Sequence, residues 1–312
     1  MTCKYSGCFG LTFLVIPKSV TSIDHTTFWG CSGLSNIEVE EGNPVYDSRE
    51  GCNAIIETAS NTLVLGCKNT TFPTSVVGIG IDAFHDCIGL STLTISETIT
   101  NIGIGAFSGC KDLTSFTIPA SVTSINDWTF ENCTALSSID IPTNVTTIGN
   151  AAFYGCTGLT SITIPNNVTE IGQYAFYSCT GLTSLSIGNG IQKIGENAFA
   201  STEELTDVYC FAENVPYDGW CAYKDSPIEY ATLHVPENSL GQYKTTYPWS
   251  DFGNIVALTE EEITNIKDIT TQSVRERYFD LSGKKLEAPI EGITIVVTEF
   301  EDGRQMVKRL VK

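Results

Sequence analysis

The sequence repeats with a period of 23 residues through most of its length. A phenylalanine, usually preceded by alanine, marks each repeat. It recurs at Phe84, Phe107, Phe130, Phe153, Phe176 and Phe199, and Tyr5 and Phe28 form an earlier pair with the same spacing. Self-similarity at a fixed period of this length is typical of a solenoid, in which each repeat packs only against its neighbours. Solenoids present extended surfaces to partners rather than closed catalytic pockets.

Each repeat contains too few apolar residues to enclose a core by itself. The repeat that begins at Ala152 has eight apolar or proline positions that recur in its neighbours: Phe153, Cys156, Leu159, Ile162, Ile164, Pro165, Val168 and Ile171. Residues 161–164 alternate polar and apolar side chains, which predicts a half-buried strand that Pro165 ends. Residues 175–179 are too short for a stable α-helix and predict one helical or 3₁₀ turn. We therefore expect a mostly β repeat solenoid whose parallel strands lie about 4.8 Å apart.

The repeated run Leu-x-x-Ile-x-Ile-Pro-x-x-Val-x-x-Ile-Gly-x-x-Ala-Phe-x-x-Cys resembles the BspA-like leucine-rich repeats. The resemblance covers about residues 5–211 and recurs in phase many times. It implies a right-handed superhelix, and it implies an adhesion module that binds host or extracellular proteins.

The charge of the chain excludes two classes of partner. The formal net charge is −19, and Lys111 is the only lysine or arginine between Lys68 and Lys193. Nucleic acids and anionic membrane surfaces require clustered cations, so neither is an expected partner. No apolar run is long enough to span a bilayer, and no signal peptide is evident. We expect that the chain is trimmed at its start or is the end of a longer array. We also expect it to be a monomer.

The twelve cysteines mostly follow the repeat. Seven share its phase and predict a buried, reduced column: Cys8, Cys31, Cys87, Cys110, Cys133, Cys156 and Cys179. No spacing typical of a zinc site occurs, so no metal is expected. Cys52 and Cys67 flank a candidate hairpin. If Glu57 faces Thr62, these two cysteines are opposite each other, which makes them a candidate disulfide. Cys210 and Cys221 form a second candidate pair.

The repeat is interrupted once and fades toward its end. Residues 41–73 form an insertion that bears the hairpin, and it is either a recognition loop or a tolerated insertion. We expect the solenoid to span residues 1–211, with an aromatic-rich cap at 212–259 and a polar linker at 260–273. A small β module follows at 274–312. Its order of Tyr278, Asp280, Leu281 and Gly283, then Gly292-Ile293 and the basic end at Lys312, resembles the sorting tails of proteins secreted by Gram-negative anaerobes. That resemblance implies an extracellular or cell-surface location.

No catalytic or cofactor-binding constellation is present. The three histidines lie in different repeats, and no nucleophile, phosphate-binding or calcium motif occurs. The carboxylates Glu38, Asp140 and Asp207 share the strand face, but they lie about 15 Å apart at sheet spacing, which is too far for paired acid–base chemistry. We expect no enzymatic activity and no cofactor.

The remaining candidates for partner binding are surface side chains. Small polar groups occupy the outward strand positions, and larger groups gather near the cap. The candidate residues are Thr92, Thr94, Thr117, Asp140 and Thr163 on the strands, and Tyr209, Tyr217, Trp220, Tyr223 and His234 near the cap. Alternatively, serine and threonine simply suit exposed strands. Three functions fit this pattern. The first is adhesion through protein–protein contacts, the second is a structural spacer that displays another domain, and the third is glycan binding or hydrolysis.

Overall fold

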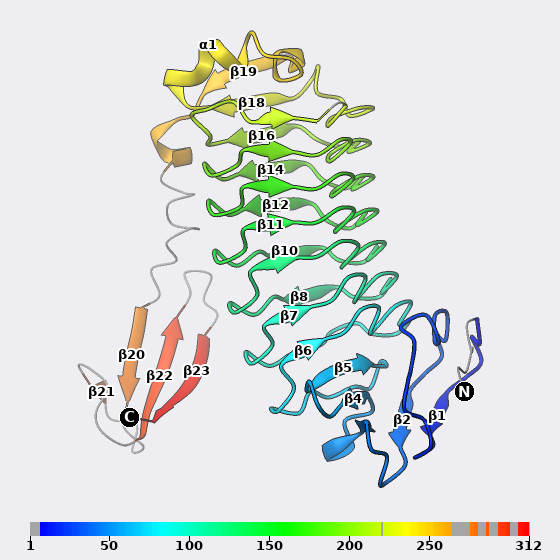
Figure 1. Cartoon of the computed structure of the whole chain (residues 1–312). Coiled ribbons are helices and arrows are strands. Elements are labelled where there is room, and N and C mark those ends of the chain that lie inside the picture. Colours follow the sequence, from blue (N-terminus) through cyan, green and yellow to red (C-terminus); the bar gives the residue numbers. More distant parts are fainter. Residues whose placement is uncertain are drawn as a thin grey trace. The chain divides into compact units, whose positions relative to one another are not determined.

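The computed structural model describes residues 7–219 and 221–263 in full and the backbone of four strands within 275–311. The chain divides into two compact units, Met1–Leu258 and Thr259–Lys312 (Figure 1). Tyr5, Trp220 and residues 264–273 of the predicted linker lie outside the described residues, as do Asp280, Leu281, Gly283, Gly292 and Lys312 of the tail.

The first unit is a β-solenoid of about 11 turns, with few helices among its described residues. The prediction of a mostly β repeat solenoid is therefore confirmed. One parallel sheet consists of β12 (Ser161–Ile164), β14 (Ser184–Ile187), β16 (Asp207–Cys210), β18 (Thr232–Val235) and β19 (Asn254–Ala257). Two further parallel pairs are β1 (Phe13–Ile16) with β2 (Asn36–Val39), and β8 (Ser115–Thr117) with β10 (Ser138–Asp140).

A second parallel sheet consists of two-residue strands in the same coils. Its members are β9 (Ser124–Ile125), β11 (Thr147–Ile148), β13 (Glu170–Ile171), β15 (Lys193–Ile194) and β17 (Tyr217–Asp218). From β9 to β15, paired residues are one 23-residue period apart, for example Ile148 with Ile171. The repeat thus sets the register directly, because identical positions face one another in adjacent coils.

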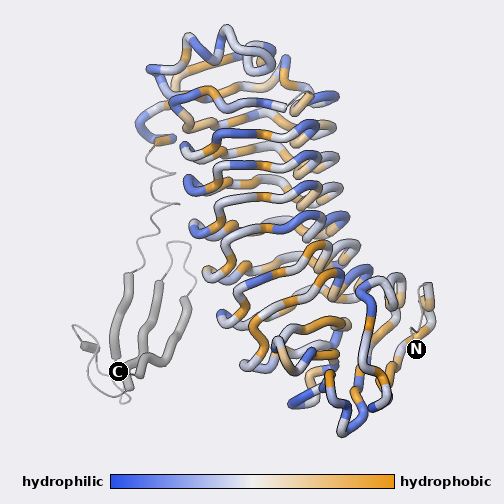
Figure 2. Tube along the Cα trace, in the orientation of Figure 1, coloured by the Kyte–Doolittle hydropathy of each residue, from blue (hydrophilic) through white to orange (hydrophobic). Residues whose placement is uncertain are grey.

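The core consists of apolar columns that run from coil to coil. Figure 2 shows hydrophobic positions recurring at the same place in successive coils. The six phenylalanines that mark the repeats from Phe84 to Phe199 are at most 1% exposed, and adjacent rings of this set stack with centroids 5.0–5.6 Å apart. Aromatic pairs at this separation add to the free energy gained from burying their area.

The turn before and after each phenylalanine has an unusual backbone. The residues two before and two after the ring have positive φ in every coil from Phe84 to Phe199, as at Trp128 (54°) and Asn132 (55°). These turns donate three hydrogen bonds to the next coil: the Trp128, Phe130 and Asn132 amides bond to carbonyls 2.6–2.9 Å away. We call this side of the solenoid the turn edge; it consists of residues 81–86, 104–109, 127–132, 150–155, 173–178 and 196–201.

Glycine is required where coils approach most closely. A Cβ added to Gly172 would lie 2.5 Å from the carbonyl carbon of Gly149 in the preceding coil. Backbone cannot move aside as a flexible side chain can, so the Ile-Gly step of the repeat reflects the spacing between coils.

The insertion joins the first coils to the main array. It contains β3 (Tyr46–Asp47), η1 (Arg49–Gly51), β4 (Ile55–Glu57) and β5 (Thr62–Leu65), and it continues in parallel into β6 (Gly78–Ile79) and β7 (Asn101–Ile102). Its residues divide between two apolar clusters, one with the first coils and one with the main array.

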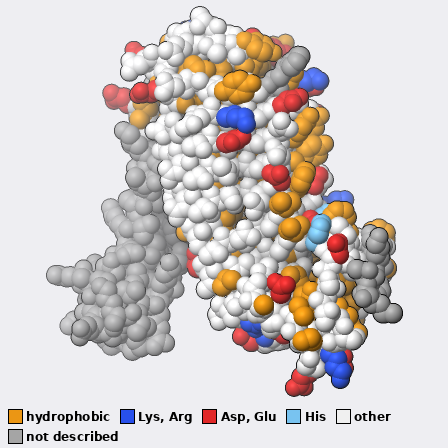
Figure 3. Space-filling view, viewed as in Figure 1, with side chains coloured by type: hydrophobic (Ala, Val, Ile, Leu, Met, Phe, Trp, Pro, Cys, Tyr) orange, Lys and Arg blue, Asp and Glu red, His pale blue; other side chains and the backbone are white. Residues whose placement is uncertain are grey.

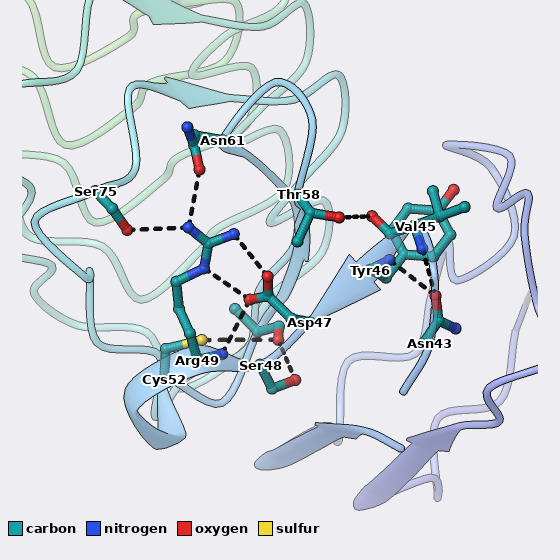
Figure 4. A network of polar contacts seen from close by, with 11 residues as sticks. Asn43, Val45, Tyr46, Asp47, Ser48, Arg49, Cys52, Thr58, Asn61 and Ser75 are labelled. Atoms are coloured by element: carbon teal, nitrogen blue, oxygen red, sulfur yellow. Dashed lines mark hydrogen bonds and ion pairs between the residues drawn. The ribbon is translucent and has the colours of Figure 1, made fainter. Parts of the chain in front are cut away.

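A polar network centred on Arg49 holds the insertion together (Figure 4). The guanidinium donates two hydrogen bonds to Asp47, at 2.8 and 2.6 Å, and a third to Asn61 at 2.8 Å. Burial alone would raise the pKa of the Asp47 carboxyl, but the bonds from Arg49 outweigh burial and hold this pKa below its usual value. These bonds join residues of the insertion to one another, so the network stabilises the insertion locally.

The cap closes the array with short helical segments and one strand. These are η2 (Glu237–Ser239), α1 (Leu240–Tyr243), η3 (Trp249–Asp251) and β19. Tyr243 and Trp249 are fully buried and pack edge to face, 5.4 Å apart. The second unit contains the antiparallel strands β20 (Arg275–Phe279), β21 (Lys285–Leu286), β22 (Ile293–Glu299) and β23 (Gln305–Val311). In the described part of the chain, no helix has the length and apolar character needed to cross a bilayer.

The cysteine column is buried as predicted from Cys31 onward, and each thiol from Cys110 to Cys179 has a specific partner. These thiols bond to the phenylalanine carbonyl of the preceding coil, as from Cys156 to Phe130 at 3.1 Å. Burial raises the pKa of Cys87 and of Cys179 to about 12. The prediction that Cys8 is buried in this column is wrong, because Cys8 is exposed in the first coil.

The predicted pairing of Cys52 with Cys67 is also corrected, since both are free thiols. Glu57 does face Thr62, but a β-bulge between Ile55 and Ile56 then shifts the register by one residue. The Cys67 thiol consequently contacts the Asn53 carbonyl at 3.4 Å. The two cysteines belong to different apolar clusters.

The second candidate pair is corrected in the same way, because Cys210 and Cys221 are free. The Cys210 sulfur lies 3.3 Å from the Tyr243 hydroxyl and is fully buried.

Native-state alkylation checks this assignment. Because buried thiols with raised pKa values form little thiolate, iodoacetamide at pH 8 should modify Cys8 first and Cys221 more slowly, and should spare the nine buried cysteines. In denaturant without reductant, intact mass should show all twelve cysteines alkylated. A shortfall of two alkyl groups that reductant restores would contradict the free-thiol assignment.

Candidate functional site

The outward side chains of the larger strands form one continuous surface, which we call the strand face. Strand pairing aligns Thr163 with Ser186, Ser186 with Tyr209, and Tyr209 with His234. A second aligned pair is Thr117 with Asp140. The register therefore brings five of the predicted residues into two rows on this face, because equivalent repeat positions stack.

The end of the strand face near the cap carries its largest groups. The Tyr209 and His234 rings stack with centroids 4.3 Å apart and an interplanar angle of 22°. The His234 Nε2 lies 3.7 Å from an Asp207 carboxylate oxygen. Tyr209 and His234 are half-buried, and both ring nitrogens of His234 are buried. The stacked pair supplies the aromatic side chains of this row, and such side chains suit a protein or glycan contact.

The rest of the strand face is polar and shallow. Thr92 and Thr94 are exposed as predicted, but residues 91–96 form no strand, so these two side chains lie on irregular backbone. Beside the strands, threonine hydroxyls bond to the backbone of the preceding coil, as from Thr206 to the Thr183 carbonyl at 3.1 Å. Those hydroxyls are used by the fold, whereas Thr117, Asp140 and Thr163 project outward.

The predicted cluster of aromatic residues at the cap is not one site. Tyr217 is 68% exposed but belongs to β17 of the other sheet, opposite Lys193. Trp220 lies outside the described residues. Tyr223 is a correction: it is 3% exposed and continues the phenylalanine stack, with its ring 5.5 Å from Phe199. A buried ring in the core cannot contact a partner.

Sequence reasoning missed the aromatic residues of the turn edge. Trp128 and Tyr174 are exposed and lie at the same repeat position, two residues before the phenylalanine. The sequence could have revealed them, because the same repeat position holds the small or turn-forming residues Asp82, Gly105 and Asn197 in other coils, and an aromatic residue there breaks the pattern.

The histidines do not converge on a reactive centre within the described residues. His25 Nδ1 lies 2.6 Å from an Asp82 oxygen. The His85 ring stacks on Trp29 at 4.9 Å. His234 is on the strand face. His25 also meets Trp29 edge to face, with ring centroids 6.1 Å apart, so His25 and His85 share one aromatic neighbour and His234 does not.

Fold and surface together define a repeat-protein scaffold with one extended strand face. The family model described as "BspA type Leucine rich repeat region" matches in six copies, over residues 2–49, 64–154 and 130–244. The chain therefore belongs to the BspA-type leucine-rich repeat family, a family of surface proteins whose fold is consistent with protein–protein interaction or adhesion.

Solved structures of bacterial leucine-rich repeat proteins are similar to this chain. One from Eubacterium ventriosum is 25% identical with a TM-score of 0.59, and the match covers 70% of this chain and 59% of that one. One from Bacteroides ovatus is 23% identical with a TM-score of 0.51, covering 81% and 62%. The pneumococcal vaccine antigen PcpA is 18% identical with a TM-score of 0.53, covering 80% and 56%. The last two show the fold alone. The chain spans less than two thirds of each of these relatives, and no curated protein matches it significantly.

One carboxyl group next to the cap is poorly solvated. Both oxygens of Asp218 are buried and receive no hydrogen bond from the described residues. Burial raises the pKa of this carboxyl to about 8. An ionised carboxylate in such a place costs free energy, so Asp218 is a weak point of the fold near neutral pH.

Replacing Asp218 with asparagine tests this weakness. The folded-state pKa lies above the ordinary value of 3.8, so the protonated carboxyl is favoured in the folded state. The resulting stability is complete below about pH 4 and is lost as the pH rises toward 8. Asp218→Asn stays neutral and should exceed the parent in free energy of unfolding by about 2–4 kcal/mol at pH 8, with little difference at pH 4. Urea denaturation at both pH values measures this, and a difference that is independent of pH would refute it.

Proposed function

We propose that this protein is a non-enzymatic, exported or cell-surface module that binds host or extracellular proteins, or their glycans, through its strand face. Family membership supports a surface role. The resemblance of residues 274–312 to bacterial sorting tails supports export. The single observation that carries the proposal is the aligned row that contains the stacked Tyr209 and His234.

The strand face carries the side chains that the core does not bury. The columns bury nearly all the phenylalanine, leucine and isoleucine side chains of the regular coils, so the strand face is left with hydroxyls, one carboxylate per few coils and the Tyr209–His234 pair. Many weak hydrogen bonds along a rigid face position a ligand, and the Tyr209 side chain near the cap contributes binding free energy. A rigid scaffold also loses little entropy on binding.

A binding screen with one matched pair of variants tests this function. The folded chain should capture at least one extracellular-matrix protein or surface glycan above background. Tyr209→Ala should weaken that capture at least about tenfold, whereas Ser186→Ala, one coil away in the same row, should change it less than about threefold.

Two outcomes would contradict the proposal. If the folded protein captures nothing from such a panel, the adhesion function fails. If capture occurs but both variants bind as the parent does, the strand face is the wrong surface. Circular dichroism of each variant establishes that the fold is intact.

A further inference from the structure

Exposed and half-buried aromatic and aliphatic side chains line the turn edge of the solenoid. We call these residues the turn-edge stripe: Ile81, Ile104, Trp128, Tyr154, Tyr174 and Tyr177. Figure 3 shows hydrophobic and acidic side chains alternating along the side of the solenoid where the turns lie in Figure 1. Trp128 is 45% exposed and Tyr174 is 38% exposed. These are large side chains left in water in coils whose repeat-marking phenylalanines are fully buried.

The tyrosines of the stripe form a continuous platform. Tyr154 and Tyr177 stack with centroids 5.1 Å apart and an interplanar angle of 12°. Tyr174 meets Tyr177 edge to face at 5.7 Å. The rings belong to consecutive coils, so the platform runs along the solenoid and suits an elongated ligand that lies in the same direction.

The fold does not call for aromatic residues at Trp128 and Tyr174. Both have left-handed backbone, with φ of 54° and 56°. Bulky side chains disfavour this conformation, and glycine, asparagine and aspartate tolerate it. Equivalent positions in other coils hold those residues, as at Gly105 and Asn197, and make the same turn. Strained backbone that carries an exposed aromatic group points to selection for recognition.

Carboxylates flank the stripe and have no basic side chain paired with them. Asp127 accepts the Asn150 amide at 2.7 Å, and Glu131 accepts the Ser108 hydroxyl at 2.9 Å. Neither forms an ion pair with lysine or arginine among the described residues. Their charge is therefore left to act on a partner, and the sequence from 69 to 192 supplies Lys111 as its only basic residue other than histidine.

We propose that the turn-edge stripe docks an extended polypeptide segment rich in arginine or lysine. Aromatic faces attract cations, and the neighbouring carboxylates complement them. The turns recur at about the 4.8 Å spacing of the strands, so an extended chain running along the solenoid meets ring and carboxylate in successive coils. This site is separate from the strand face and does not rest on the function proposed for it.

Titration of an arginine-rich peptide, followed by fluorescence anisotropy at physiological ionic strength, tests the proposal. The variant Trp128→Gly/Tyr174→Gly should bind about tenfold more weakly, because each exposed cation–aromatic contact contributes a few-fold in affinity. Ala151→Gly changes the same backbone position without removing a ring and should stay within about twofold of the parent. If the glycine variant unfolds, Trp128→Asn/Tyr174→Asn replaces it.

A second pair of variants separates a specific site from general attraction to an acidic protein. Asp127→Asn/Glu131→Gln should lose about tenfold. Glu97→Gln/Glu229→Gln removes the same charge far from the stripe and should lose less than about twofold. Equal losses in the two charge variants would overturn the proposal, as would unchanged binding in the aromatic variant. A neutral oligosaccharide that binds the parent and is lost with the rings, while the arginine-rich peptide is unaffected, would overturn it in favour of a glycan site.

Discussion

The contact between equivalent side chains in successive coils is the interaction on which the structure depends. One coil of 23 residues cannot enclose its own apolar groups, so burial comes only from stacking. The phenylalanine rings, 5.0–5.6 Å apart, are the largest of these contacts. The glycines that permit close approach, the left-handed turn residues and the thiol-to-carbonyl bonds all follow from holding identical coils at one spacing.

This dependence separates residues that hold the fold from residues available for recognition. A side chain that points into a column is fixed by its two neighbours and has no freedom to evolve a contact with a partner. The outward strand positions and the turn edge face no such requirement. The two surfaces differ in chemistry, because the strand face is lined by hydroxyls with the Tyr209–His234 pair at its end, and the turn edge carries exposed rings between carboxylates.

Much of the architecture could be read from the period, and the failures have identifiable causes. Residues 23 apart had to stack, which was enough to predict the solenoid and the inward column of cysteines from Cys31 onward. The bulge between Ile55 and Ile56 could not be predicted, because register in a short hairpin depends on local twist. Tyr223 was misjudged because the last coil has one extra residue, which hides that this ring continues the stack.

The stripe was missed for a different reason. A repeated position was judged by its commonest role, whereas Trp128 departs from the small or turn-forming residues found there in other coils.

A comparison of two rings in the same turn tests the central claim most directly. Phe130 is buried in the stack and Trp128 is exposed two residues away. Urea denaturation should show a loss of about 3–5 kcal/mol in the free energy of unfolding for Phe130→Ala and no loss for Trp128→Asn. Similar losses for both variants would contradict the division between rings that hold the coils together and rings left for a partner.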